Sequence, residues 1–116
     1  MTIKIYHNPR CSKSRQALEA LQNKGIEPEI ILYLETPPSF AEIADILKKL
    51  QMKPRDIMRK KEAEYEEQNL SNQKLSDSDL IEAITKTPKL LERPIVVNGN
   101  KVAIGRPLEN ILKIID

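Results

Sequence analysis

The first third of the chain switches from a strand pattern to a helix pattern and back. Residues 2–6 alternate polar and apolar side chains, which is typical of a half-buried strand. Apolar residues then recur at helical spacing within residues 12–24, and Gly25 follows where helices commonly end. Residues 29–33 form an apolar run too short for a helix. The pattern predicts a strand, a crossover helix and a second, parallel strand with a right-handed connection.

The middle of the chain has the pattern of several short helices. Ser39 and Glu42 have the spacing of a capping box, and a helix with one apolar face is predicted after them. Pro54 is expected to open another short helix, and the charged residues 60–67 indicate a solvated helical face. Ser76 is predicted to cap a further helix. None of these segments requires a functional explanation.

The last third returns to strands. Residues 95–97 and 101–104 flank an Asn-Gly-Asn turn, which is typical of a β-hairpin, and Pro107 suits the first turn of a final helix. Two parallel strands plus a hairpin give a four-stranded mixed sheet with flanking helices. We therefore predict an α/β fold of thioredoxin-like type with a helical insertion, formed by residues 1–116 as a single domain.

Composition narrows the classes of function. The chain has 116 residues, of which 40% are hydrophobic and 31% charged, as expected of a globular protein whose core needs no structural metal. A net charge of +2 and four aromatic residues argue against a nucleic-acid partner. Three glycines cannot supply a phosphate-binding loop, so no nucleotide cofactor is expected. A single cysteine and no membrane-length apolar stretch favour the cytoplasm and no membrane partner.

The single cysteine, Cys11, is the strongest candidate for chemistry. It follows the first predicted strand and a proline-bearing turn, which places its sulfur at a helix N-terminus, where the thiolate is favoured. His7, Arg10, Lys13 and Arg15 are expected to add positive charge around it. A reactive thiolate facing an anionic substrate is therefore predicted.

Structural roles are the alternatives for two of these residues. Free cysteines are often buried as small hydrophobic groups, although the polar neighbours of Cys11 favour an exposed loop. A lone histidine is usually a hydrogen-bonded structural group, so His7 either holds the loop or assists the thiolate.

Three further arginines, Arg59, Arg93 and Arg106, are considered as site residues. Arg93 precedes Pro94 at a strand entrance, where a cis peptide bond is plausible; in a thioredoxin-like fold this proline faces the cysteine loop and brings Arg93 near Cys11. Arg106 leaves the neighbouring strand and could reach the same region. The pattern around Arg59 indicates only a surface charge.

These residues together resemble the glutaredoxin-dependent arsenate reductases and their small cytoplasmic relatives. The resemblance covers nearly the whole chain. It rests on Tyr6-His7-Asn8-Pro9, Cys11 with Ser14-Arg15, residues 31–35, Arg59-Lys60, residues 91–97 around Arg93-Pro94, and Arg106-Pro107.

The resemblance implies roles for the site residues. In the family, the matching cysteine is the nucleophile and three arginines surround the oxyanion. Carried over, catalytic roles fall to Cys11, His7 and Arg15, oxyanion binding to Ser12, Ser14, Arg59, Arg93 and Arg106, and a structural role to Pro94. No metal and no bound cofactor are expected at this site.

The implied reaction is the reduction of arsenate to arsenite, as in arsenical resistance. The Cys11 thiolate attacks arsenate, glutathione serves as co-substrate, and glutaredoxin resolves the mixed disulfide. A single cysteine excludes resolution by a second cysteine of the same chain. A monomer is expected.

Two alternatives share the fold. This chain has Arg10, Ser12 and Lys13 where well-known members carry small residues and a glycine, so a thiol-dependent reductase of another substrate stays open. The chain also lacks the longer charged tail of some members, which is expected to leave activity unaffected. A redox-sensing regulator that binds RNA polymerase would carry a Cys-x-x-Cys switch, but position 14 is Ser14.

Overall fold

The computed structural model describes residues 2–115, which form two compact units. Among the described residues, the first unit combines residues 2–36 with residues 93–115, and the second is Pro37–Glu92. The second unit is thus the predicted helical insertion. Whether the whole chain behaves as a single domain stays a prediction.

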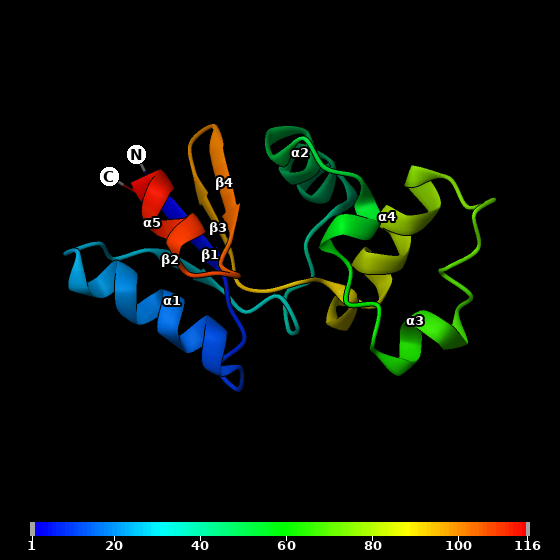
Figure 1. Ribbon diagram of the computed structural model, residues 1–116, viewed down its shortest axis with the longest axis horizontal. Helices are drawn as coiled ribbons and strands as arrows, with labels where there is room; N and C mark the ends of the chain where they lie inside the picture. The colour runs from blue at the N-terminus through cyan, green and yellow to red at the C-terminus, as the bar shows by residue number, and fades with distance from the viewer. Residues whose placement is uncertain (1, 116) are drawn as a thin grey trace. The chain divides into compact units, whose positions relative to one another are not determined.

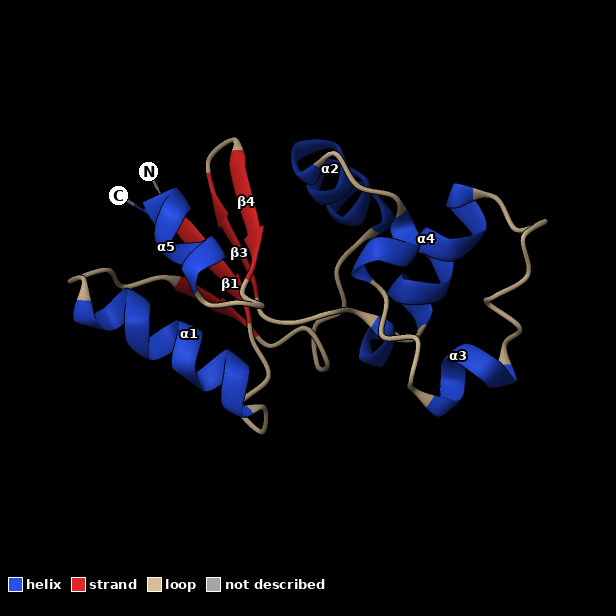
Figure 2. Ribbon diagram, in the orientation of Figure 1, coloured by secondary structure: helices blue, strands red, loops and turns tan. Residues whose placement is uncertain are grey.

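A four-stranded mixed sheet forms the centre of the first unit (Figures 1 and 2). Its strand order is β2-β1-β3-β4, with β1 parallel to β2 and antiparallel to β3, and β3 antiparallel to β4. Two helices complete the unit. The elements are β1 (Ile3–Tyr6), α1 (Ser12–Asn23), β2 (Glu29–Ile31), β3 (Ile95–Asn98), β4 (Lys101–Ile104) and α5 (Glu109–Ile115). The predicted α/β, thioredoxin-like arrangement is confirmed.

One buried cluster of this unit lies on a single face of the sheet. Ile5, Val96 and Ala103 are cross-strand partners, so their side chains point to the same side. They pack with Leu21 of α1 and Ile111 of α5 in one buried cluster. Burial of this face holds α1 against the end of β1, and it thereby fixes the loop that connects them.

The second unit consists of short helices. Its elements are α2 (Phe40–Leu50), the 3₁₀ helices η1 (Pro54–Ile57) and η2 (Pro88–Leu90), α3 (Ala63–Glu67) and α4 (Asp77–Lys86). The predicted capping box at Ser39 is present, and Ser76 caps α4 in the same way. Helix α4 packs against α2, η1 and η2.

Element ends differ from the predictions, for example in the charged stretch 60–67, where α3 covers only Ala63–Glu67. The strand predicted over residues 29–33 ends at Ile31, because a turn closed by hydrogen bonds to Leu32 O begins next. The final helix begins at Glu109 and not at Pro107, since residues 107–111 first make turns, with Asn110 N donating to Pro107 O. None of the helices within residues 2–115 has both the length and the apolar character needed to cross a membrane.

Candidate active site

Cys11 stands at the start of helix α1, as predicted. Strand β1 ends at Tyr6, a four-residue loop follows, and Cys11 is the N-cap residue of α1 with an extended backbone. Its N–H donates to Asn8 O at 3.0 Å, and its carbonyl accepts from Arg15 N at 3.0 Å. The side chain is half-buried. The sulfur therefore lies beside the free amides of the first helical turn.

These amides and one arginine lower the pKa of the Cys11 thiol. Partial burial alone raises that pKa, because it disfavours the charged form. Hydrogen bonds from the N–H groups of Ser14 and Lys13, together with the charge and a hydrogen bond of Arg93, outweigh burial. The net result is a pKa below that of an ordinary thiol, which favours the thiolate.

Two arginines of the β3–β4 hairpin reach the sulfur. Arg93 precedes Pro94, and their peptide bond is cis, as the sequence suggested. The Arg106–Pro107 bond is also cis. Arg106 Nη2 lies 3.9 Å from Cys11 Sγ, and its Nε donates to Arg93 O at 3.0 Å. Arg93 precedes β3 and Arg106 follows β4, and the two strands are antiparallel. Both arginines therefore lie at the same end of the hairpin, near the thiol.

His7 holds the loop and does not contribute charge. The ring is 5% exposed, and its Nδ1 lies 2.7 Å from the Oγ of the fully buried Ser14. That Oγ also accepts from Asn8 N at 3.0 Å. Burial and the nearby charge of Arg15 lower the pKa of His7, so the ring is neutral at pH 7. The expectation that His7 adds positive charge is wrong, because a buried imidazole loses hydration when it is protonated.

The other loop residues act largely through loop structure. Arg15 Nη1 donates to Pro9 O at 2.9 Å, which braces the turn before Cys11. The Ser14 hydroxyl already bonds to His7 and Asn8 within the loop. The backbone N–H of Ser14 is therefore the group that can contact a bound oxyanion. Ser12 is exposed in the first turn of α1. The side-chain charge of Lys13 was expected to act on the thiol, but the N–H of Lys13 does so.

Arg59 belongs to the second unit. It lies between η1 and α3, and its Nη1 makes an ion pair with Glu62 Oε1 at 2.9 Å. Glu62 Oε2 lies 3.5 Å from Lys89 Nζ, which also pairs with Glu64. The Arg59 side chain is thus held in a small ion network. Its role in oxyanion binding stays a prediction.

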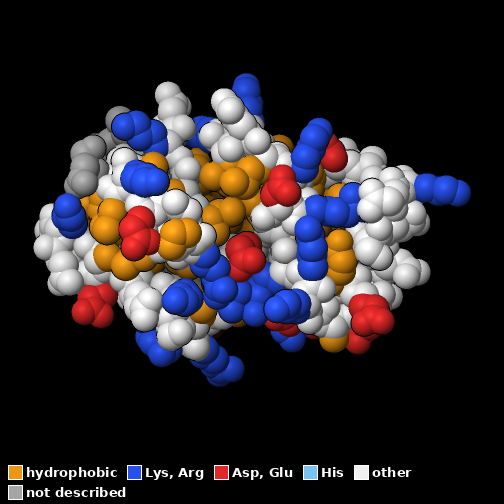
Figure 3. Space-filling model, viewed as in Figure 1, with side chains coloured by type: hydrophobic (Ala, Val, Ile, Leu, Met, Phe, Trp, Pro, Cys, Tyr) orange, Lys and Arg blue, Asp and Glu red, His pale blue; other side chains and the backbone are white. Residues whose placement is uncertain are grey.

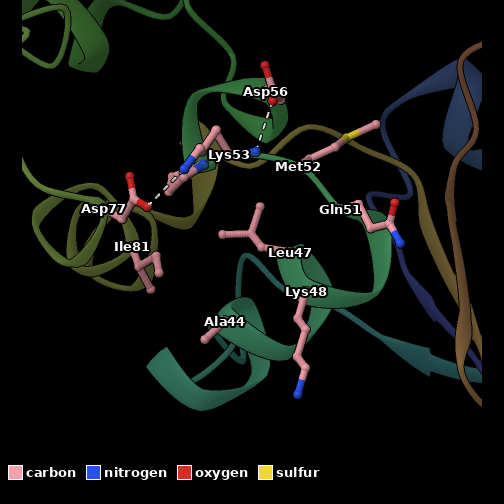
Figure 4. Close-up of a pocket in the computed structure, with 10 residues that line it drawn as sticks. Ala44, Leu47, Lys48, Gln51, Met52, Lys53, Asp56, Asp77 and Ile81 are labelled. Carbon is pink, nitrogen blue, oxygen red and sulfur yellow. Dashed lines mark hydrogen bonds and ion pairs between the residues drawn. The ribbon is translucent and has the colours of Figure 1, made fainter.

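The second unit also contains a cavity of about 470 Å³ (Figure 4). Among its charged groups, Lys53 Nζ lies 3.9 Å from Asp77 Oδ2, and Asp56 Oδ2 accepts from the backbone N–H of Lys53. No cysteine or histidine lines it, since the one of each that the chain has lies in the first unit. Thiol chemistry is therefore not expected there.

Charged side chains of both signs lie on the face of the protein shown in Figure 3. In Figure 3, acidic side chains are interspersed among the Lys and Arg side chains of the face shown, in keeping with the net charge of +2. No group of three or more His, Cys, Asp or Glu side chains suited to a metal is found within residues 2–115.

Several known proteins resemble this chain in sequence and in structure. The chain is 54% identical over 114 residues to the Escherichia coli K12 protein called "Uncharacterized protein YfgD". The aligned region covers 97% of this chain and 96% of that protein. It is 52% identical over 110 residues to an arsenate reductase of Neisseria meningitidis serogroup A, with 94% of each chain covered. An arsenate reductase structure from Vibrio cholerae superposes with a TM-score of 0.96 at 47% identity, covering 99% of this chain and 98% of that one.

Membership of a family follows from the extent of these matches. The sequence model of the ArsC family matches residues 6–114, which include the cysteine loop and both hairpin arginines. The chain belongs to the ArsC family.

Proposed function

We propose that this protein reduces arsenate to arsenite, with Cys11 as the nucleophile and glutathione as co-substrate. The observation that carries the proposal is the Cys11 sulfur, whose pKa is lowered and which Arg93 and Arg106 both reach. Relatives that cover nearly all of this chain are named arsenate reductases. A thiolate beside two guanidinium groups suits attack on a tetrahedral oxyanion.

The first step forms a sulfur–arsenic bond. The Cys11 thiolate attacks arsenic, and an arsenate oxygen leaves as water after it takes up protons. Arginine suits the bound oxyanion because its planar fork offers two parallel donors and keeps its charge at any physiological pH. Arg93 and Arg106 supply such forks from the first unit, and we assign Arg59 the same task from the second.

The second step reduces arsenic. A glutathione thiolate attacks the Cys11 sulfur and forms a disulfide bond, while the electron pair of the sulfur–arsenic bond stays on arsenic. Arsenic thereby passes from the +5 to the +3 state and leaves as arsenite. The two sulfur atoms supply the two electrons.

The third step restores the enzyme. A thiolate of glutaredoxin attacks the glutathione sulfur of the mixed disulfide, which releases the Cys11 thiolate. The thiol must come from another molecule, because the chain has only one cysteine. The proposed enzyme works without a bound cofactor, as a monomer, in the cytoplasm.

One feature favours a second candidate, a thiol-dependent reductase of another oxidised substrate. Arg10, Ser12 and Lys13, where well-known members carry small residues and a glycine, are all exposed around the cysteine. A larger anionic substrate could contact them directly. This candidate keeps the same nucleophile and the same thiol chemistry.

A coupled assay tests the proposal and separates the two candidates. NADPH oxidation is followed with glutathione reductase, glutathione, glutaredoxin and this protein, with arsenate or another oxidant added last. The proposal predicts NADPH oxidation that depends on arsenate and disappears in Cys11→Ser. Turnover with another oxidant but none with arsenate would favour the second candidate and overturn the first.

A further inference from the structure

A groove beside the candidate active site has the charges to bind a small thiol. We infer that the groove lined by Lys13, Gln16, Arg106 and Glu109 binds the thiol co-substrate, a peptide thiol with two carboxylates and one ammonium group, as in glutathione. The inference rests on the proposed function, and it adds a binding site for the second substrate.

The groove lies entirely within the first unit. The groove is lined by Lys13 and Gln16 from the first two turns of α1, and by the segment from Gly105 to Glu109 that leads into α5. Its volume is about 390 Å³, which is within the usual range for small-molecule sites. A tripeptide is therefore a suitable occupant.

Two residues connect the groove to the nucleophile. Arg106 lines the groove and also places Nη2 3.9 Å from Cys11 Sγ. Lys13 also lines the groove, and its N–H hydrogen-bonds to the thiol. A thiol held in the groove is thus next to the sulfur that it must attack in the proposed second step.

The charges in the groove match those of glutathione. Lys13 and Arg106 are cations and Glu109 is an anion, whereas the tripeptide carries two carboxylates and one ammonium group. Lys13 makes no ion pair with any residue in the range 2–115, and its side chain is exposed, so its charge is available to a ligand. Gln16 adds an amide that can pair with a peptide group.

A second groove near the cysteine loop lacks this pattern. It has a volume of about 300 Å³ and is lined in part by Arg10, Leu32, Leu34 and Glu35. This lining offers only one fully charged cation, opposite one carboxylate and two leucines. The groove at Lys13, with two cations, therefore matches the charges of a ligand with two carboxylates better than this second groove does.

Disulfide exchange tests the site without arsenate. The Cys11 thiolate attacks one sulfur of oxidised glutathione, a new disulfide bond forms, and one glutathione thiolate leaves. The rate is compared with that for hydroxyethyl disulfide, which is uncharged and reports only the intrinsic reactivity of Cys11. The ratio of the two rates measures recognition of the glutathione charges.

Charge reversal at Lys13 should lower this ratio. We expect Lys13→Glu to reduce it about tenfold, because an attractive contact becomes repulsive, and Lys13→Arg to retain it. Lys101→Glu is the matched control, since Lys101 is an exposed lysine at the opposite end of β4 from Gly105. It should leave the ratio unchanged, and an equal fall in both Glu variants would overturn the inference.

Glu109→Gln separates a binding site from general attraction. Removal of an acidic group makes the surface more positive, so general attraction would speed the reaction with anionic oxidised glutathione. A site in which Glu109 pairs with the ammonium group predicts the reverse, a ratio about threefold lower. A ratio that rises would overturn the inference.

The results of these tests distinguish failure of the groove from failure of the proposed arsenate reduction. Arsenate reduction that persists while the ratio is unaffected by Lys13→Glu and Glu109→Gln would overturn only the groove. Lowered ratios in a protein that does not reduce arsenate would overturn the arsenate proposal and keep the groove. If both variants slow only a thiol-bearing protein partner, the occupant is a protein and the inference is wrong.

Discussion

The reactivity of Cys11 comes from the first amides of α1 and from Arg93, which together lower the pKa of the thiol. The sequence predicted that the helix N-terminus and the basic residues of the loop would both stabilise the thiolate. In the structure, the helix amides and Arg93, which is 82 positions away in the sequence, lower the thiol pKa. Side chains that are close in sequence can still point away from the group they flank.

A titration of the thiol tests this account of the pKa. The rate of alkylation by iodoacetamide should rise with pH around a midpoint below that of a free thiol, about 8.5, because only the thiolate reacts. Arg93→Gln should move the midpoint upwards, whereas Arg10→Gln should have little effect. A midpoint at or above the free-thiol value would remove the basis for nucleophilic attack.

Arg93→Lys probes the shape of the oxyanion contact. Lysine keeps the charge but loses the planar pair of donors, so we expect kcat/KM to fall about tenfold, which is roughly 1.4 kcal/mol of transition-state binding. The melting temperature should be unchanged. Equal kcat/KM in the two proteins would make Arg93 a generic counter-charge, and a large loss of stability would make it structural.

The buried Ser14 hydroxyl is predicted to stabilise the loop. In Ser14→Ala, Asn8 N and His7 Nδ1 lose a common partner in a buried place, which should cost about 1–3 kcal/mol in the free energy of unfolding. Urea denaturation measures this change. Ser12→Ala is the matched control, because Ser12 is exposed two residues away, and it should cost less than about 0.5 kcal/mol. Equal effects would contradict the assigned loop contacts.

His7 gives a pH dependence whose sign can be worked out. Its folded pKa is below 6.5, so below that pH the unfolded chain takes up a proton that the folded protein does not, and stability falls as the pH falls. Because the chain has a single histidine, one imidazole resonance in NMR reports this pKa. A value above 6.5 would contradict the neutral ring and restore His7 as a candidate cation.

At the scale of elements, the close packing behind the site depends on Gly105. A Cβ at this position would lie 2.5 Å from Ile111 Cδ1 and 2.7 Å from Pro94 Cγ. The isoleucine end can move, but the proline ring has little freedom. We expect Gly105→Ala to destabilise the protein by about 1–3 kcal/mol through overpacking.

The test for Gly105 has a matched control. Gly25 has nothing within 4 Å of an added Cβ, so Gly25→Ala introduces no clash, although its positive φ of 76° adds backbone strain. Thermal melts of the two variants, each with and without Ile111→Val, should show partial rescue only for Gly105→Ala. No rescue would mean that the proline contact alone sets the cost.

The sequence predicted elements better than it predicted their ends. Apolar spacing located the sheet strands and helices, and turn chemistry located the hairpin. The end of β2 and the start of α5 were missed, because turns at Leu32 and Pro107 compete with the regular pattern. The hydrogen bond between His7 and Ser14 was also missed, since nothing in the spacing shows that both side chains are buried.

At the scale of the whole molecule, the candidate site draws on distant parts of the sequence. Cys11, Arg93 and Arg106 lie in one unit because the hairpin returns to pair with β1. Arg59 lies in the inserted unit, and only the resemblance to the arsenate reductases suggested its role. Local patterns can place elements, whereas contacts between remote segments depend on the assembled fold.

Arg59 is predicted to act on substrate binding. Arg59→Ala should raise the KM for arsenate about tenfold or more while Cys11 keeps its alkylation midpoint, because the arginine binds the oxyanion and not the free thiolate. Glu62→Gln is a useful comparison, since it removes the ion pair and keeps Arg59. An unchanged KM in Arg59→Ala would leave the guanidinium with a structural role alone.

The most direct test of the central claim is the intact mass of the protein after one cycle. The protein is incubated with arsenate and glutathione but without glutaredoxin, and arsenite is measured in the same sample. We predict one glutathione per chain, attached at Cys11, with one arsenite formed for each modified chain, and neither product in Cys11→Ser. Arsenite formed without the mixed disulfide, or glutathione attached at the same rate without arsenate, would contradict the account.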